Sequence, residues 1–293
     1  MSDSLRPPEP VSADDPRIEA MRHLLGVIDR LRAPDGCPWD LEQTEASMAP
    51  CLIEEAHELQ EAIENESPEA RASEAGDVLM NVALIARIAE QEGSWDLADA
   101  TNDSVAKLVR RHPHVFGDLE AADTGEVLRN WEAIKRQERG AKGSDDSAVA
   151  GVPKALPALQ RAARLAGKAA QVGFQWDSVG GAFDKLVEEF GELSELLPES
   201  LLAGARKPEL EPEHRARLEH ELGDLLLAGS ILGRYLGLDA EAACRAATRR
   251  FEGRFRVMEE NLRSTNPEQP FEGLDEDGLR QAWTQAKADP RTE

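Results

Sequence analysis

The sequence predicts an all-α protein built from two tandem helical-bundle domains. Three observations support this fold class. Charged residues make up 31% of the 293 residues and aromatic residues only 4%, and such a composition favours helices over sheets. Apolar residues recur at helical spacing along much of the chain. An acidic motif also occurs twice, which indicates an internal duplication.

We expect two domains, an N-terminal tail and a linker, in line with the length of the chain. Residues 1–15 are rich in Pro, Ser and Asp and are expected to be disordered. The N-terminal helical domain is predicted at 16–139 and the C-terminal one at 158–293. Between them, 140–157 contains a Gly-Ser-Asp-Asp-Ser stretch that is typical of linkers.

Within the N-terminal domain, the first helix is marked by apolar residues at helical spacing from Ile18 to Leu31. Pro and Gly then predict a loop at 33–40. Further helices are expected at about 44–64, 68–92, 95–111 and 124–139.

The C-terminal domain is predicted to repeat this order, with helices at about 157–172, 179–197, 213–236 and 239–264 and a final helix. That final helix carries Trp283 and Lys287, which have the same spacing as Trp131 and Lys135. A longer connection at 198–212 separates the acidic helices. Because neither half supplies enough long helices to enclose its own apolar stripes, we expect dimerisation to complete each bundle.

Two pairs of acidic helices carry the strongest functional signal. Carboxylates three residues apart share one face of a helix, and four convergent carboxylates form a hard-oxygen site suited to Mg²⁺. The motif reads Glu-Glu-x-x-Glu and then Glu-x-x-Asp, at Glu54, Glu55, Glu58, Glu74 and Asp77 and again at Glu188, Glu189, Glu192, Glu221 and Asp224.

The position of these acids favours a metal site over a solvated acidic face. Glu74 lies in line with Val78 and Ile85, within an apolar stripe. Glu221 lies in line with Leu225 in the second copy. A buried carboxylate without a partner is costly, so we expect these acids to be paired, neutralised or metal-bound. The alternative, a solvated face, suits most of the 57 Asp and Glu residues.

Composition also excludes several classes of partner. A net charge of −23 argues against a nucleic-acid duplex. No signal peptide and no apolar run of about 18 residues is present, so we expect a cytoplasmic protein without a membrane partner. The three scattered cysteines predict neither a disulfide framework nor a zinc site. His112-Pro113-His114 is interpreted as a loop or helix end rather than a metal-binding pair.

Five motifs occur in a fixed order. In the N-terminal half they are Cys-Pro-Trp-Asp at 37–40, the two acidic motifs, Arg-Arg-His-Pro-His-Val-Phe at 110–116 and Trp-Glu-x-Ile-Lys at 131–135. Each motif alone is weak, but five in order, with the acidic ones repeated, are specific. This order resembles the MazG family of nucleoside triphosphate pyrophosphohydrolases, over nearly the whole chain after about residue 18.

The resemblance implies an all-α homodimer that uses Mg²⁺, with Mn²⁺ as a substitute. Such an enzyme cleaves nucleoside triphosphates between the α and β phosphates. The products would be a nucleoside monophosphate and pyrophosphate. The resemblance further implies broad base tolerance and a role in cleansing the nucleotide pool.

The resemblance also assigns roles to individual residues. The metal ligands would be Glu189, Glu192, Glu221 and Asp224 in the C-terminal half, and Glu55, Glu58, Glu74 and Asp77 in the N-terminal half. In two-domain members the C-terminal half is typically competent. Its triphosphate contacts would be Lys185, Arg217, Arg250 and Arg254, with Trp283 near the nucleotide. Lys185 and Arg254 would stabilise developing charge. Glu188 is a candidate general base, although an exposed helix residue explains it equally well.

The N-terminal half departs from this pattern at one position, because Cys51 stands where Lys185 would be. Its basic residues Lys107, Arg110 and Arg111 nevertheless keep the full pattern of substrate contacts, whereas Gly253 occupies a place where the family often has Arg. Both halves therefore remain candidates. A different interpretation of the basic clusters is that they offset the dipoles of helix C-termini.

Three alternatives stay open at this point. A narrow-specificity relative of dUTPases or of phosphoribosyl-ATP pyrophosphohydrolases would share the acidic helices. A carboxylate-bridged di-iron bundle needs Glu-x-x-His, whereas here the fourth position is Asp. A non-catalytic acidic scaffold would need neither Lys185 nor Arg254.

Overall fold

The computed structural model describes residues 5–141, 145, 147–197, 202–203 and 209–292. These residues form helices and connections and contain no strand, which confirms the predicted all-α class. The chain divides into two compact units, Met1–Lys142 and Gly143–Glu293. Parts of the predicted tail, of the linker 140–157 and of the connection 198–212 lie outside the described residues, and the predicted domain boundaries stay predictions.

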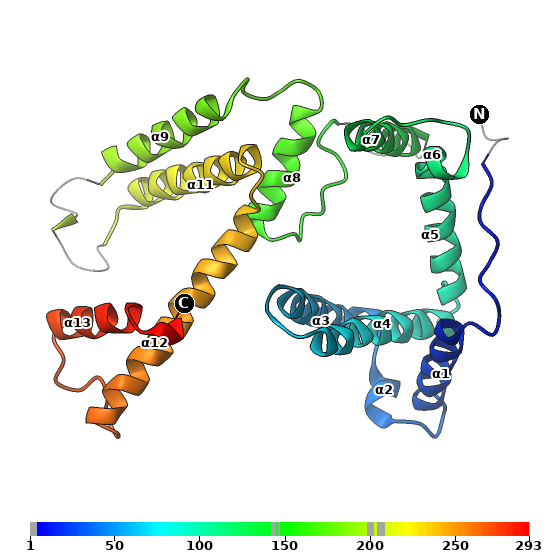
Figure 1. The fold of residues 1–293 in the computed structure, drawn as a ribbon, viewed down its shortest axis with the longest axis horizontal. Coiled ribbons are helices and arrows are strands. Elements are labelled where there is room, and N and C mark those ends of the chain that lie inside the picture. The colour runs from blue at the N-terminus through cyan, green and yellow to red at the C-terminus, as the bar shows by residue number, and fades with distance from the viewer. Residues whose placement is uncertain (1–4, 142–144, 146, 198–201, 204–208, 293) are drawn as a thin grey trace. The chain divides into compact units, whose positions relative to one another are not determined.

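Unit 1 is built around an antiparallel pair of helices, α3 and α4 (Figure 1). Helix α1 packs against α4, and the core that α1, α3 and α4 share contains Ile28, Met48, Leu84 and Ile88. Helix α5 then leads to α6 and α7. The bounds are α1 Pro16–Leu31, α2 Pro38–Glu42, α3 Glu45–Asn65, α4 Pro68–Gln91, α5 Leu97–Arg111, α6 Pro113–Phe116 and α7 Thr124–Ala141.

The predicted loop at 33–40 was wrong at its end, because helix α2 already begins at Pro38. Proline has the φ angle of a first helical residue and needs no N–H partner there. The guanidinium of Arg32, which is 8% exposed, fastens this short helix by donating to the carbonyl of Asp40, and its Nε donates to Gln91 Oε1 at 2.8 Å. The segment is therefore tied to α4.

Unit 2 repeats the arrangement with the antiparallel pair α9 and α11 (Figure 1). Helix α8 packs against α11, where Ser230 Oγ donates to the Leu159 carbonyl at 2.7 Å. A separate apolar cluster of Val257, Met258 and Ala286 joins α12 to α13. The bounds are α8 Ala158–Ala170, α9 Val179–Glu195, α11 Pro212–Tyr235, α12 Ala240–Thr265, α13 Glu276–Lys287 and the 3-10 turn η1 Pro290–Thr292.

The loop before α9 is positioned by close packing and a hydrogen bond. The ring of Trp176 lies over Gly181, so that a side chain on Gly181 would approach Trp176 Cδ1 to 2.8 Å. Tyr235 Oη, at the end of α11, donates to the Trp176 carbonyl at 2.7 Å. Ser178 caps α9 by accepting from the Gly181 N–H. These contacts fix where the acidic face of α9 begins.

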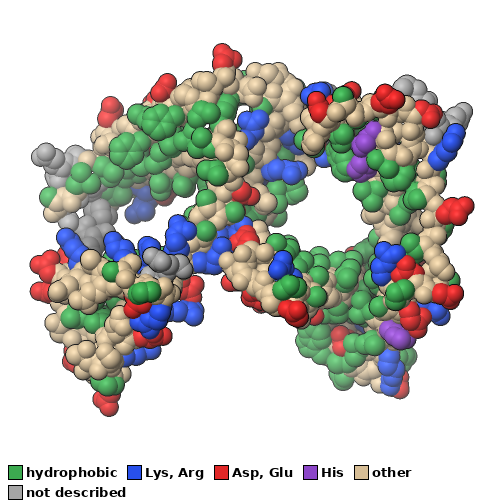
Figure 2. All heavy atoms as spheres, viewed as in Figure 1, with side chains coloured by type: hydrophobic (Ala, Val, Ile, Leu, Met, Phe, Trp, Pro, Cys, Tyr) green, Lys and Arg blue, Asp and Glu red, His purple; other side chains and the backbone are tan. Residues whose placement is uncertain are grey.

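Both helix pairs leave apolar side chains exposed on one side. On α9 and α11 these include Phe183, Val187, Phe190, Leu222 and Leu226, and Figure 2 shows hydrophobic surface over this pair. Unit 1 exposes Ile53, Ile63 and Leu79 on α3 and α4. Dimerisation, which these faces are expected to drive, stays a prediction. Among the described helices, none combines the length and the apolar character that crossing a membrane requires.

Candidate functional site

The C-terminal acidic residues converge between α9 and α11. Carboxylate oxygens of Glu189, Glu221 and Asp224 lie within 4.8 Å of one another. Glu189 is only 5% exposed, whereas the other two are half-buried. The fourth predicted ligand, Glu192, is exposed and lies outside this trio, but its pKa is raised, first by desolvation and then by repulsion from Glu189 and Glu221. Glu192 therefore shares the electrostatic environment of Glu189 and Glu221.

Lys185 balances part of this charge. Its Nζ lies 2.6 Å from Glu189 Oε1 and 2.8 Å from Glu188 Oε1, one helical turn along α9. The hydrogen bonds to these two carboxylates raise the pKa of Lys185 far above its usual value, so the amine stays protonated. His220 Nε2 lies 3.4 Å from Asp224 Oδ2 and adds a cation only when it is protonated. The predicted general base Glu188 is thus held beside the site.

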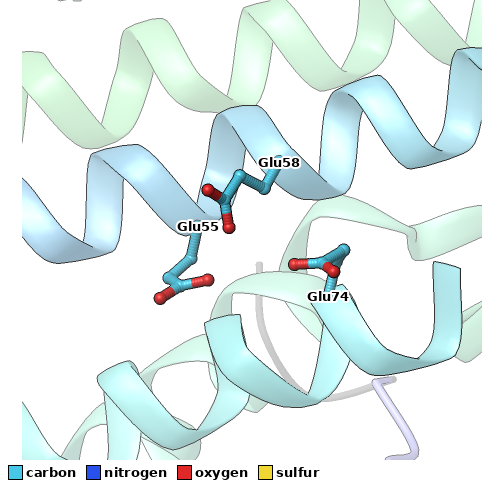
Figure 3. A group of neighbouring side chains, drawn as sticks. All are labelled: Glu55, Glu58 and Glu74. Carbon is cyan, nitrogen blue, oxygen red and sulfur yellow. The ribbon is translucent and has the colours of Figure 1, made fainter. Parts of the chain in front are cut away.

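The N-terminal acidic residues converge in the same way between α3 and α4. Oxygens of Glu55, Glu58 and Glu74 lie within 4.8 Å of one another, and Figure 3 shows the three side chains directed into the space between the two helices. Desolvation raises the pKa of Glu55 and of Glu74, and repulsion from Glu58 and Asp77 adds to both shifts. Asp77 is half-buried nearby on α4 but does not join the trio.

Cys51 takes the place of Lys185 in unit 1, and its side chain packs against the apolar core of α1, α3 and α4. The N-terminal group therefore lacks the cation that its counterpart has on the same helix. In both groups the donors are carboxylate oxygens from two helices, which is the ligand set that hard divalent cations prefer. Both groups can hold a metal ion, and the residues present fit one.

The predicted substrate contacts of unit 2 lie on α11, α12 and α13. Arg217 is exposed on α11, one turn before Glu221, and Arg250 is exposed on α12. Arg254 is half-buried, and among the described residues its Nε has no hydrogen-bond partner. The structure therefore places the α12 cations on a different element from the acids.

An aromatic pair stands beside the α12 cations. The ring centroids of Phe251 and Trp283 lie 5.2 Å apart, and Phe251 also stacks on Phe255 at 6.1 Å. Phe251 is 58% exposed. Trp283 is among the residues that the motifs predict near the nucleotide, whereas Phe251 is not. The available signal was the spacing of Phe251 and Phe255, which places both on one helical face next to the arginines.

The predicted substrate contacts of unit 1 form ion pairs with acidic residues outside the N-terminal acidic group. Lys107 forms an ion pair with Asp103 of its own helix. Arg110 Nε and Arg111 Nη2 each lie 2.6 Å from a carboxylate oxygen of Glu138 on α7. Hydrogen bonds from Arg111 and then Arg110 lower the pKa of Glu138. The structure therefore does not bring these three cations to the N-terminal acidic group.

The histidines after α5 belong to the helix end. His112 is the C-terminal cap of α5, its Nδ1 lies 2.6 Å from the Leu108 carbonyl, and its ring meets Trp131 edge-on at 4.6 Å. Helix α6 begins at Pro113. This geometry agrees with the helix-end interpretation of the motif.

Comparisons with known proteins identify the family. The family model described as the MazG nucleotide pyrophosphohydrolase domain matches residues 43–116, from the start of α3 to α6. A nucleoside triphosphate pyrophosphohydrolase of Escherichia coli (strain K12) is 40% identical over 265 residues, which cover 90% of this chain and 95% of that protein. The chain belongs to the MazG family.

Two other relatives are similar over different shares of the chain. The Thermotoga maritima protein named nucleoside triphosphate pyrophosphohydrolase/pyrophosphatase MazG is 39% identical over 272 residues, 92% of this chain and 96% of that protein. The nucleoside triphosphate pyrophosphohydrolase of Mycobacterium tuberculosis is 33% identical over 158 residues, 53% of this chain and 47% of that protein. MazG membership confirms the resemblance drawn from the motifs and makes the chain a hydrolase.

Proposed function

We propose that this MazG-family chain hydrolyses nucleoside triphosphates to nucleoside monophosphates and pyrophosphate with Mg²⁺ as its cofactor. The observation that carries the proposal is the convergence of Glu189, Glu221 and Asp224 within 4.8 Å, next to the protonated Lys185. A cluster of one buried and two half-buried carboxylates with one cation suits a ligand that brings both a divalent ion and phosphate groups. The names of the relatives support the same substrate class.

The roles of the C-terminal residues follow from their chemistry. Glu189, Glu192, Glu221 and Asp224 would hold Mg²⁺, which supplies charge neutralisation and an activated water. Lys185 carries three N–H donors and would exchange Glu188 for phosphate oxygens when a triphosphate arrives. Glu188, released from that ion pair, would accept the proton of the attacking water. Arg217, Arg250 and Arg254 would neutralise the remaining phosphate charge.

The aromatic pair supports a broad base tolerance. Stacking of a base on the exposed ring of Phe251, or on the half-buried ring of Trp283, depends little on which base is bound, because every base has a π face. Specific rejection of a base requires hydrogen-bonding groups aimed at its edge. A nucleotide-pool enzyme of this kind would act in the cytoplasm, as a homodimer.

A panel of substrates tests the proposal. Pyrophosphate release is measured from the eight standard ribonucleoside and deoxyribonucleoside triphosphates, and from dUTP and phosphoribosyl-ATP as separate substrates. Each is tested with Mg²⁺, with Mn²⁺ and with EDTA, and the products are separated by chromatography. We expect monophosphate and pyrophosphate from all eight in Mg²⁺, more slowly in Mn²⁺, and none in EDTA. Diphosphate and orthophosphate as products would contradict cleavage between the α and β phosphates. Turnover of dUTP or of phosphoribosyl-ATP alone would replace broad tolerance with a narrow specificity.

A further inference from the structure

We infer that unit 2 has a second anion-binding site, on α8 and the end of α11, for a ligand that carries two or more linked phosphate groups. Its arginines are Arg161 and Arg164 on α8 and Arg234 on α11. The site shares no residue with the acidic group or with the predicted substrate contacts. Because binding can be measured without turnover, the inference does not depend on the proposed function.

The segment that contains α8 has an unusual charge for this chain. Residues 147–176 contain no Asp or Glu, although these two residue types account for 57 of the 293 residues. The same segment contains Lys154, Arg161, Arg164 and Lys168. Figure 2 shows Lys and Arg side chains over α8. In a chain with a net charge of −23, such a positive surface attracts anions locally.

The cations of α8 form one strip along the helix. At 3.6 residues per turn, Arg161 and Lys168 are about 20° apart around the axis, and Arg164 is about 60° from Arg161. Along the axis, the strip runs for about 10 Å from Arg161 to Lys168. Lys168 is 7% exposed and Arg161 is half-buried, whereas Arg164 is exposed. A single phosphate ion is too small to contact both ends of this strip.

Arg234 adds a guanidinium from α11 at the side of the strip. A side chain on Gly167 would lie 3.5 Å from Arg234 Nε and 4.0 Å from Arg234 Cδ, so the arginine lies directly on α8 where Gly167 leaves room. Gly167 is about 60° further around α8 than Arg164. The Cζ atom of Arg234 also lies 5.6 Å from the ring centroid of Tyr235, whose Oη donates to the Trp176 carbonyl. The position of this guanidinium is therefore well defined.

The three arginines have no acidic partner. In the described part of the chain, no ion pair or side-chain hydrogen bond joins Arg161, Arg164 or Arg234 to an acidic residue. The Nε of Arg161 is moreover buried without a hydrogen-bond partner there, and such a donor is costly until an acceptor reaches it. Arg256 and Arg280, by contrast, each pair with a glutamate of their own helix. The donors of the cluster are thus available to a ligand.

Helix dipoles do not account for the cluster. A cation is favourable near the C-terminus of a helix and unfavourable near its N-terminus. Arg234 lies in the last turn of α11, where it offsets the dipole. Arg161, however, lies in the first turn of α8, which begins at Ala158, and Arg164 follows one turn later. A bound anion would stabilise cations at these positions, whereas the dipole of α8 does not.

The chemistry of the three guanidiniums favours linked phosphate groups. A guanidinium can donate two parallel hydrogen bonds to phosphate oxygens, and such charge-assisted bonds are about twice as strong as neutral ones. Several guanidiniums along one strip suit a ligand whose oxygens are spread over two or more phosphorus atoms. Free pyrophosphate, which the proposed reaction releases, has this chemistry, and so has the 5′-diphosphate group of a nucleotide.

Calorimetric titration of the full chain with pyrophosphate in EDTA tests the site. Without metal, the carboxylates of α9 and α11 repel an anion. The triple variant Arg161→Gln, Arg164→Gln, Arg234→Gln should bind pyrophosphate at least about 100-fold more weakly than the wild type, and Arg164→Gln alone about 10-fold more weakly. Unchanged affinity of the triple variant would overturn the inference, as would a wild type that binds no pyrophosphate at millimolar concentration.

Two control variants separate this site from other arginines. Arg256→Gln removes an arginine that pairs with Glu252, and it should bind pyrophosphate as the wild type does. A chain with Arg250→Ala and Arg254→Ala lacks the predicted substrate contacts of α12 and should also keep its metal-free affinity. If this chain lost binding while the triple variant kept it, pyrophosphate would occupy the substrate contacts, contrary to the inference.

Thermal melts in EDTA control for misfolding, because Arg161 is half-buried. Pyrophosphate should raise the melting temperature of the wild type and of Arg256→Gln, since a ligand that binds the folded state stabilises it. The melting temperature of the triple variant should not change. Should the triple variant fail to fold, Arg164→Gln decides, because its side chain is exposed. A wild-type response to pyrophosphate in that folded variant would contradict the site.

Titrations with ADP and with orthophosphate in EDTA identify the ligand. Equal affinities for ADP and pyrophosphate would assign the site to the diphosphate group that both contain. Tighter binding of ADP would support a nucleotide as the ligand, and tighter binding of pyrophosphate would support the reaction product. Orthophosphate that binds as tightly as pyrophosphate would overturn the assignment to linked phosphates. If the wild type hydrolysed no triphosphate, the proposed function would fail, and these metal-free titrations would still decide whether the site exists.

Discussion

At the scale of single residues, the two acidic groups differ by one cation. Lys185 contacts both Glu188 and Glu189 in unit 2, whereas Cys51 in unit 1 packs against the apolar core. The N-terminal carboxylates therefore face one another without compensation on their own helix. We propose that this difference makes the C-terminal group the more active one.

Substitution of one acid in each unit tests this assignment. Asp224→Ala should lower kcat by about 100-fold or more, because a missing carboxylate weakens metal binding. Asp77→Ala should cost much less, because its group lacks a lysine. Lys185→Ala should lower kcat by about 10- to 1000-fold, the range for one charge-stabilising donor. Steady-state pyrophosphate release measures all three variants, and a dead Asp77→Ala with an active Asp224→Ala would reverse the assignment.

The raised pKa values predict how the metal-free protein responds to pH. The pKa of Glu74 is raised above its ordinary value of 4.5. The folded state therefore binds a proton on Glu74 more tightly than the unfolded state does. As the pH rises above 4.5, ionisation of Glu74 lowers the free energy of unfolding. Without metal, Glu74→Gln should thus be more stable than the wild type at neutral pH, by a margin that shrinks toward pH about 4.5. Thermal melts in EDTA measure the margin, and equal melting temperatures at pH 7 would contradict it.

At the residue scale, spacing alone placed the acids correctly on facing helices but did not give their exposure. Glu189 is buried, whereas Glu58 and Glu192 are exposed. The reason is that each unit packs two acidic helices as a pair, so that one edge of each helix still faces solvent. The ion pairs of Arg110 and Arg111 with Glu138 could also not be predicted from the sequence, because they depend on how α7 packs on α5.

At the scale of elements, the long helices were predictable and the short ones were not. Helices α3, α4, α9 and α11 have clear apolar periodicity, so their predicted ranges lie close to the observed bounds. Helices α2 and α6 have 5 and 4 residues and begin at Pro38 and Pro113. In so short a segment there is no period to detect, and proline reads equally as a loop signal or as a helix start.

The start of α9 offers a test with a matched control. Gly181→Ala should destabilise unit 2 by about 1–3 kcal/mol, because the new methyl group would meet Trp176 at 2.8 Å. Gly180→Ala in the same turn meets nothing closer than Ser178 Oγ at 3.4 Å. It should be neutral or stabilising, because alanine favours a helix by up to about 1 kcal/mol over glycine. Urea unfolding measures the free energy of unfolding of both variants. Equal changes in that free energy would show that the Trp176 ring moves aside without an energetic penalty.

At the scale of the whole molecule, the feature considered is the large net negative charge and its effect on thermal stability. A net charge of −23 on 293 residues repels itself, and salt screens this repulsion. The melting temperature should therefore rise between about 0.1 and 2 M KCl, where the screening length falls below 10 Å. A gain that continues to the highest concentration would support adaptation to a saline cytoplasm. A melting temperature that stays constant over this range would contradict adaptation to a saline cytoplasm.

The short distance between the rings of Tyr235 and Trp176 has a consequence for the fluorescence of the chain. The chain contains one tyrosine, and its ring centroid lies 6.4 Å from that of Trp176. Over so short a separation the indole quenches the phenol, so the folded chain should emit almost no tyrosine fluorescence. Both rings belong to unit 2, whereas unit 1 contributes tryptophan emission alone. Recovery of the tyrosine signal therefore reports the unfolding of unit 2, and its coincidence with the tryptophan signal would reveal whether the two units unfold as one.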